Sequence, residues 1–222
     1  MADKLPTGSP VLDDLLEGGY ETDVVTMIYG PAGSGKTTTC VLAAAEVAKG
    51  KKKVIFVDTE GGFSGERLGQ LCADSKELMK NIMVLKPTNF QAQQKSIENL
   101  NSMIDPKVGL VVCDTISALY RTERGEDNAL LNRVLARQLG LLLEISRKHN
   151  IPVILTNQVY TDFENKESVR QVGGDIMMYN SKCLIELKSG SRGNRMAVLR
   201  KHRHLPERSV PFKIVEKGFE AL

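Results

Sequence analysis

Short apolar runs alternate with longer amphipathic segments along the chain as far as Gln158. The apolar runs are bounded by turn-forming residues and predict strands at 24–30, 52–58, 82–87, 108–114 and 151–157. Between them, apolar residues recur at helical spacing and predict helices at 36–49, 65–74, 89–104 and 127–148. This alternation predicts an α/β fold with a largely parallel central sheet covered by helices.

The pattern changes after Gln158. Residues 159–173 are polar and charged without clear periodicity, and they predict a loop. Short strands with hairpin signals follow at 181–188, 195–202 and 210–216. We expect these to add antiparallel hairpin strands to one edge of the sheet. Because the sequence contains no internal repeat or linker, we predict a single domain over residues 1–222.

Composition narrows the class of protein. Hydrophobic residues make up 41% of the chain and charged residues 26%, which is ordinary for a globular protein. No apolar run approaches the length of a membrane span, and the N-terminal residues lack the apolar core of a signal peptide. We therefore expect a cytoplasmic protein without a membrane partner. The four cysteines are not paired as CxxC and are expected to be free thiols.

Positive charge is concentrated near the C-terminus. Residues 182–222 carry ten Lys and Arg against four Glu, a net of +6. Residues 1–181 carry 20 basic against 23 acidic residues, a net of −3. Such a basic segment fits an anionic partner, although a solvated edge hairpin with protective lysines gives the same pattern.

The segment GPAGSGKT matches the phosphate-binding motif G-x-x-x-x-G-K-[ST] and lies between a predicted strand and a predicted helix. Its glycines let backbone N–H groups point at phosphate oxygens, and the helix directs its positive end to the same place. Lys36 is expected to reach the β- and γ-phosphates, and the Thr37 hydroxyl to bind Mg²⁺. The predicted nucleotide-binding residues are Gly30, Pro31, Ala32, Gly33, Ser34, Gly35, Lys36, Thr37 and Thr38.

Asp114 ends the apolar strand 108–114. A carboxylate delivered to that edge of the sheet can hold Mg²⁺ beside the phosphates. The alternative is that Asp114 only caps a following helix.

The stretch VDTEGGFSGERL, residues 57–68, places Asp58 and Glu60 directly after a strand. One interpretation is a solvated acidic turn. The other is that Glu60 faces the γ-phosphate, because strand 52–58 is expected beside the phosphate-binding strand.

Four segments extend the comparison beyond the phosphate-binding motif: VDTEGGFSGERL, CDTISALYRTERGED, VILTNQV and VGGDIMMYNSKCLIEL. In this order around one phosphate-binding loop, they resemble the RecA-like recombinase core of archaea and eukaryotes. The resemblance runs from about residue 5 to the C-terminus. It implies a RecA-like P-loop ATPase core that uses ATP and Mg²⁺, here without the N-terminal helical DNA-binding domain of the full recombinases.

The resemblance also implies roles for individual residues. Glu60 matches the catalytic glutamate that activates water, and Gln158 matches the glutamine that senses the γ-phosphate. Lys36 belongs with them in the catalytic set. Arg67 matches the arginine that packs on adenine, with a solvated helix position as the alternative. Two DNA-facing loops correspond to residues 121–127 and 159–173, and their basic residues are Arg121, Arg124, Lys166 and Arg170.

A dense basic cluster, RKHRH, occupies residues 200–204. Lys201 and Arg203 are candidates to contact the DNA backbone or the γ-phosphate of a neighbouring subunit. A basic edge with neither role is the third possibility.

Departures from the full recombinases shape the expected function. The missing N-terminal domain and the acidic second loop disfavour long filaments and efficient strand exchange. We expect an accessory protein of recombination and repair that binds ATP and single-stranded or branched DNA and hydrolyses ATP weakly. The resemblance suggests RadA recombinase and a Holliday-junction resolvase as partners, with possible self-association. The alternatives are an active DNA-dependent recombinase, or a circadian-clock-type regulatory ATPase that does not bind DNA.

Overall fold

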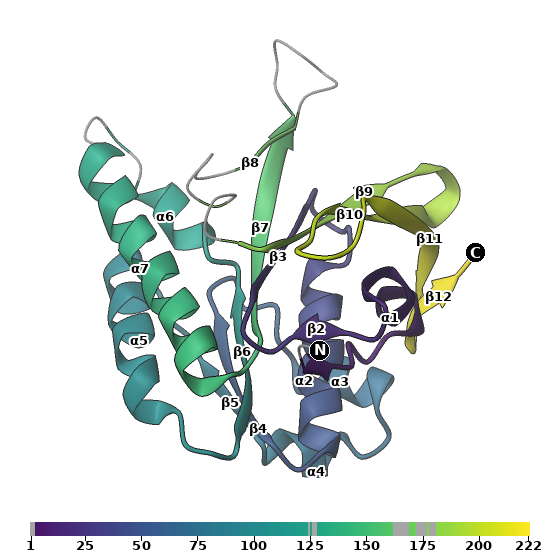
Figure 1. Cartoon of the computed structure of the whole chain (residues 1–222), viewed down its shortest axis with the longest axis horizontal. Helices are drawn as coiled ribbons and strands as arrows, with labels where there is room; N and C mark the ends of the chain where they lie inside the picture. The colour runs from purple at the N-terminus through teal and green to yellow at the C-terminus, as the bar shows by residue number, and fades with distance from the viewer. Residues whose placement is uncertain (1–2, 124, 126–127, 162–168, 172–176, 178–180) are drawn as a thin grey trace.

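The computed structural model describes residues 3–123, 125, 128–161, 169–171, 177 and 181–222, with the backbone alone at 160–161 and 169–171. Its core is a mixed sheet (Figure 1). Within the described ranges, the order of this sheet is β12-β11-β10-β9-β3-β7-β6-β4-β5. The α/β fold with a largely parallel sheet, predicted from the alternating pattern, is confirmed.

The parallel part of the sheet contains the strands predicted from the apolar runs. They are β3 (Val25–Gly30), β4 (Lys53–Asp58), β5 (Ile82–Leu85), β6 (Val108–Asp114) and β7 (Val153–Thr161). β7 runs past the predicted end at residue 157, and its extension pairs with β8 (Val169–Gln171), inside the segment predicted to be a loop. The long apolar runs were therefore reliable guides to the buried strands.

The predicted antiparallel hairpin strands are confirmed, since β9 (Cys183–Ser189) pairs antiparallel with β10, but β9 also joins the central sheet by pairing parallel to β3. The antiparallel arrangement begins with β10 (Asn194–Lys201), which follows a 3₁₀ turn at Ser191–Gly193, and continues through β11 (Arg208–Val215) and β12 (Gly218–Ala221). A hydrophobic pattern identifies a strand but does not fix its direction in the sheet.

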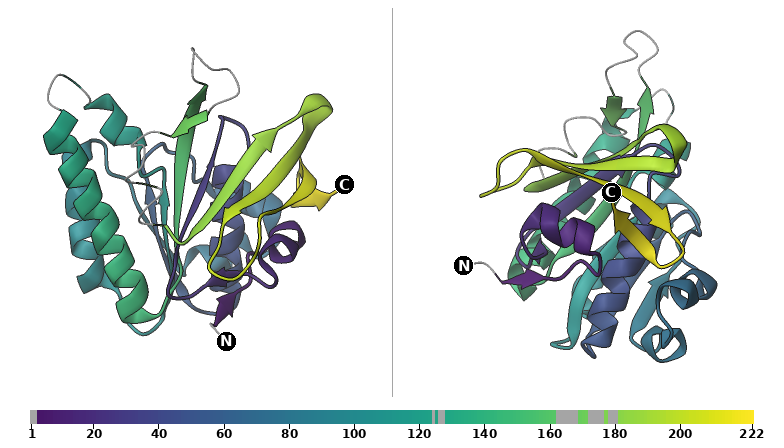
Figure 2. Two further views of the ribbon diagram at one scale, coloured as in Figure 1. Left: turned by 45° about the horizontal axis from the view of Figure 1, so that its top comes forward. Right: turned by 90° about the vertical axis from the view of Figure 1, so that its right-hand side faces the viewer.

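Helices cover both faces of the sheet (Figure 2). One face carries α1 (Pro10–Leu16), α2 (Lys36–Lys49), α3 (Gly65–Leu71) and α4 (Ser75–Met79). The other carries α5 (Phe90–Met103), α6 (Ala118–Thr122) and α7 (Asn128–His149). Successive residues of β3 point to opposite faces, so that Ile28 belongs to the first core and Met27 to the second.

Several short elements escaped prediction from the sequence. A two-stranded sheet joins β1 (Lys4–Leu5) to β2 (Tyr20–Glu21), and α1 lies between them. The helix predicted at 65–74 ends at Leu71 as α3, and a second short helix, α4 at Ser75–Met79, follows outside the predicted range. Two-residue strands and helices of five to seven residues are too short to show a hydrophobic period. Among the described residues, no helix has the length and apolar character that crossing a membrane requires.

Candidate active site

The register of the parallel strands brings the predicted site residues to one edge of the sheet. Gly30 at the end of β3 is level with Gln158 in β7, and Asp58 at the end of β4 is level with Asp114 in β6. The carboxyl ends of parallel strands are where ligands bind in open α/β sheets. Four residues that are far apart in the sequence thus share one location.

The loop between β3 and α2 has the shape that a phosphate cradle requires. Gly33 and Gly35 have φ angles of +71° and +109°, in the left-handed region that side chains disfavour. Gly30 is needed for space, because a Cβ there would lie 2.3 Å from the carbonyl oxygen of Leu187. α2 begins directly after Gly35, so its N-terminal N–H groups open onto the loop.

Lys36 is the buried cation of this loop, with only 7% of its surface exposed. Its ammonium donates to the carbonyl oxygens of Gly30 and Pro31, each at 2.9 Å. Burial lowers the pKa of Lys36, although the nearby carboxylates of Asp114 and Glu60 act in the opposite direction. A desolvated ammonium beside a loop of N–H groups is suited to a polyphosphate.

Two further observations fit a magnesium nucleotide. The Ser34 hydroxyl is buried in the loop without a hydrogen-bond partner in the described structure. A Cβ on Gly62 would come within 3.4 Å of the Thr37 hydroxyl and 3.8 Å of a carboxylate oxygen of Asp114, so glycine keeps the space between these groups open. A hydroxyl and a carboxylate are hard oxygen ligands suited to Mg²⁺, which keeps waters and phosphates as its other ligands.

Asp114 is buried beside this space. Its carboxylate accepts hydrogen bonds from the Thr156 and Thr37 hydroxyls. Burial raises the pKa of Asp114, and the two hydroxyls partly offset this effect. The capping alternative does not fit, because the next helix begins at Ala118, beyond the reach of an N-cap at residue 114.

Asp58 at the end of β4 and Glu60 just beyond it are two acidic residues with different contacts. Asp58 accepts hydrogen bonds from the backbone N–H groups of Gly62 and Phe63 at 3.0 and 3.2 Å, so it shapes the turn. Glu60 instead faces the site. Its carboxylate accepts from the amide of Gln158 at 2.7 Å and from the hydroxyl of Thr115 at 3.1 Å. The expectation that strand 52–58 lies beside the phosphate-binding strand is wrong, because β7 and β6 separate β3 from β4 in the sheet.

Gln158 connects Glu60 to α6. While its amide nitrogen donates to Glu60, its amide oxygen accepts a hydrogen bond from the guanidinium of Arg121 at 3.1 Å. Glu60, Gln158 and Arg121 come from three separate segments and form one chain of hydrogen bonds. The sequence indicated these three residues but not Thr115 and Thr156, which tie Glu60 and Asp114 to the neighbouring strand ends.

Arg67 lies on α3, where its guanidinium donates to Gln70 at 2.8 Å and to the carbonyl oxygen of Glu216 at 3.2 Å. These contacts hold it against the turn between β11 and β12. The side chains of Ile214 and Phe219, from the same two strands, would lie 3.1 Å from a Cβ on Gly35. An apolar surface therefore adjoins the phosphate-binding loop, and no sequence motif had indicated it.

The basic cluster at 200–204 lies elsewhere. Leu199 and Lys201 pair with the beginning of β9, at the edge of the sheet opposite the phosphate-binding loop. Arg203 donates to Glu21 and to Asp23, each at 3.0 Å, and Lys201 donates to the carbonyl oxygen of Ser181 at 2.9 Å. Within one chain, neither residue adjoins the candidate active site.

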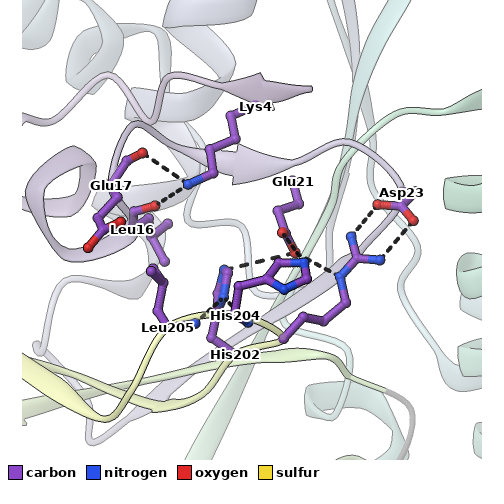
Figure 3. Close-up of polar contacts among 9 residues, drawn as sticks. Lys4, Leu16, Glu17, Glu21, Asp23, His202, His204 and Leu205 are labelled. Atoms are coloured by element: carbon purple, nitrogen blue, oxygen red, sulfur yellow. Dashed lines mark hydrogen bonds and ion pairs between the residues drawn. The ribbon is translucent and has the colours of Figure 1, made fainter. Parts of the chain in front are cut away.

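These contacts form a latch between the N-terminal segment and the β10–β11 connection, which we define as Glu21, Asp23, His202, Arg203 and His204 (Figure 3). Burial lowers the pKa of His202, although Glu21 acts in the opposite direction. As pH falls below 6.5, the imidazole of His202 therefore binds a proton more readily in the unfolded chain than in the folded chain. The folded state loses stability as a result. The hydrogen bond from Arg203 lowers the pKa of Asp23, whose contribution is lost only as pH falls through that lower value.

The structure describes no side-chain position for three of the predicted DNA-facing residues. Arg124 and Lys166 lie outside the described residues, and Arg170 is described by its backbone alone, in β8. Arg121, at the other predicted loop, is described and lies on α6.

Comparison with known proteins identifies the family of the chain. The Rad51 family model matches residues 3–222. The DNA repair and recombination protein RadB of Methanobrevibacter smithii is 41% identical, with the match covering 97% of this chain and 94% of that protein. RadB of Thermococcus gammatolerans is 43% identical, over 97% and 98% respectively. A crystal structure of a RadB recombinase matches with a TM-score of 0.85 and 39% identity, and the match covers 98% of this chain and 99% of that chain.

The resemblance inferred from the sequence motifs is therefore confirmed at the level of the family. The match includes the phosphate-binding loop, the ends of β4, β6 and β7, and the C-terminal strands. This chain belongs to the Rad51 family and is similar along almost its whole length to RadB proteins.

Proposed function

We propose that the chain binds MgATP at the edge formed by β3, β4, β6 and β7 and hydrolyses it slowly. The observation that carries this proposal is the convergence of Lys36, Asp114, Glu60 and Gln158 at the phosphate-binding loop. Lys36 would exchange its two carbonyl partners for the β- and γ-phosphates. Thr37 and Asp114 would hold Mg²⁺, which supplies neutralisation of the phosphate charge.

Glu60 is the group proposed to orient the attacking water and to accept its proton. Both of its carboxylate oxygens are already engaged, one by Gln158 and one by Thr115. The direction in which Glu60 points therefore depends on Gln158. Because the amide of Gln158 can donate either to Glu60 or to a phosphate oxygen, it is suited to report whether a γ-phosphate is present. Because both carboxylate oxygens of Glu60 accept hydrogen bonds from protein groups, they are less available to a water molecule, which fits slow ATP hydrolysis.

Arg67, Ile214 and Phe219 are proposed to receive the base. A guanidinium can stack on an aromatic ring, and the apolar pair would cover ring surface that is otherwise exposed to water. This surface is proposed to select a purine by stacking, next to a phosphate site that is common to many nucleotides.

We further propose that the chain binds single-stranded or branched DNA as an accessory protein of homologous recombination and repair. The names of its relatives support a role in DNA repair and recombination. Arg121 supports a DNA-binding surface at the predicted loop 121–127, because its hydrogen bond links this region to Gln158 and, through Gln158, to Glu60. Arg203 lies at the opposite edge of the sheet from the site, where it is paired with Glu21 and Asp23, so the proposed DNA surface rests on Arg121. RadA recombinase and a Holliday-junction resolvase remain proposed partners, together with self-association.

Binding of a fluorescent single-stranded oligonucleotide at several salt concentrations tests the DNA proposal. We expect affinity that falls with salt, and Arg121→Ala to reduce the slope of log affinity against log salt by about 0.7, the value for one phosphate contact on a single strand. Arg137→Ala, an exposed arginine on α7 paired with Glu98, is the matched control and should leave the slope unchanged. Absence of salt-sensitive binding by the unaltered protein would contradict the proposal and favour a regulatory ATPase without DNA.

A further inference from the structure

The hairpin formed by β9 and β10 contacts the phosphate-binding loop through Arg195. Arg195, the second residue of β10, pairs with Ser189 of β9 at the edge of the sheet where the loop lies. Its guanidinium approaches the carbonyl oxygen of Gly33 with two nitrogens, Nε at 3.3 Å and Nη2 at 3.1 Å. Its third nitrogen, Nη1, donates to the carbonyl oxygen of Gly193 at 2.8 Å. One side chain therefore joins the hairpin turn to the tip of the loop.

The tip of the loop has little else to hold it. Gly33 has a left-handed φ of +71°, and a Cβ placed there would meet nothing within 4 Å. The next N–H group, that of Ser34, reaches the carbonyl oxygen of Pro31 at a long 3.3 Å. The Gly33–Ser34 peptide thus presents its carbonyl oxygen to Arg195 and its N–H group to the loop. Fixing the carbonyl oxygen fixes the direction of the N–H group, because the two belong to one planar peptide.

We propose that Arg195 is a positioning residue of the phosphate site, one that clamps the Gly33 carbonyl and so holds the loop ready for a polyphosphate. This inference rests on the proposed MgATP site and adds to it a residue from the opposite end of the chain. The clamp acts in two ways. It orders the loop before the ligand arrives, which removes part of the entropic cost of binding, and it places a permanent positive charge next to the phosphates.

The geometry requires arginine in particular. A guanidinium offers donors in a rigid fork, so it can hold one carbonyl oxygen with two N–H groups while a third nitrogen reaches another. A lysine ammonium carries the same charge on a flexible stem and lacks the fork. Arg195→Lys therefore separates the effect of charge from the effect of positioning.

A matched control lies three residues away. Arg192, in the 3₁₀ turn Ser191–Gly193, has the same charge and lies in the same hairpin. Within the described part of the chain its side chain makes no hydrogen bond or ion pair. Arg192→Ala changes the net charge of the hairpin by the same amount as Arg195→Ala without removing the clamp.

Calorimetric affinities for MgADP and for a nonhydrolysable MgATP analogue test the inference, together with KM, kcat and the melting midpoint of the nucleotide-free protein. We expect Arg195→Ala to weaken both nucleotides about tenfold, which corresponds to ~1.4 kcal/mol, and to raise KM with little change in kcat. Arg195→Lys should recover only part of the affinity. Arg192→Ala should match the unaltered protein.

Three results would overturn the inference. Equal affinities for Arg195→Ala and Arg192→Ala would show that the clamp is not used. Full recovery by Arg195→Lys would assign the effect to charge alone. A lower melting midpoint with unchanged affinity would assign Arg195 to stability. If the unaltered protein failed to bind MgATP, that result would contradict the proposed nucleotide site itself, and the inference about Arg195 would be contradicted as well.

Discussion

Replacing Lys36 with alanine is expected to weaken MgATP binding by roughly 100-fold and to abolish measurable hydrolysis. The ammonium is the buried cation of the phosphate-binding loop, and Gly30 and Pro31 already hold it at the place where phosphates would bind. Without it, the β- and γ-phosphates would have to enter a desolvated site that lacks its positive charge. Titration calorimetry with a nonhydrolysable analogue measures the loss directly.

The fold should tolerate this change. Burial lowers the pKa of Lys36, which means that keeping its charge inside the protein is unfavourable before any phosphate binds. We therefore expect the melting midpoint of nucleotide-free Lys36→Ala to stay close to that of the unaltered protein. Lys49→Ala, on the same helix but at its exposed C-terminal end, is the control and should bind MgATP normally. An affinity for Lys36→Ala close to that of the control would contradict the assignment of the loop.

Glu60→Gln is expected to retain MgATP binding and to lower hydrolysis by about 10²-fold or more, the range for loss of a general base. The amide has the shape of the carboxylate, so its oxygen can still accept from Gln158 and its nitrogen can donate to the Thr115 hydroxyl. What the substitution removes is the negative charge and the ability to take a proton from water. Single-turnover hydrolysis separates this effect from binding.

Glu66→Gln provides the matched control, because Glu66 is an exposed acid in the first turn of α3, in the same stretch of sequence. It should leave hydrolysis unchanged. Hydrolysis by Glu60→Gln at the rate of this control would remove Glu60 from the catalytic role and return residues 57–68 to a purely structural turn.

The parts of the fold that could be predicted are those with long, regular patterns. The buried strands β3, β4, β6 and β7 are apolar on both faces, and α2 and α7 are long enough to show their period. The short N-terminal strands lack such patterns. The parallel direction of β9 depends on its pairing with β3 in space, which no local pattern encodes.

The candidate site was predictable to the same degree. The phosphate-binding motif carries its own geometry in its glycines and lysine, so Gly30 to Thr37 could be predicted directly as candidate phosphate-binding residues. The separation of Asp58 from Glu60 could not, because it depends on which carboxylate accepts the N–H groups of the turn. Contacts between distant segments were also hidden: Arg203 meets Asp23 across 180 residues, and Arg195 meets Gly33 across 162.

The latch shows how such a contact changes an interpretation. In the sequence, residues 200–204 are a basic cluster suited to an anion. In the structure, Arg203 is joined to Glu21 and Asp23, whose carboxylates offset its charge. The same cluster therefore stabilises the N-terminal segment against the β10–β11 connection. Net charge along a sequence indicates a partner only where the charges are not already paired within the fold.

Steady-state ATP turnover by the unaltered protein, with and without saturating single-stranded DNA, tests the central claim most directly. The claim is that Glu60, held by Gln158 and Thr115, supports only slow hydrolysis in an accessory DNA-binding protein. The account predicts a slow, magnesium-dependent turnover that DNA leaves nearly unchanged. Strong stimulation by DNA would contradict it and would identify an active DNA-dependent recombinase ATPase.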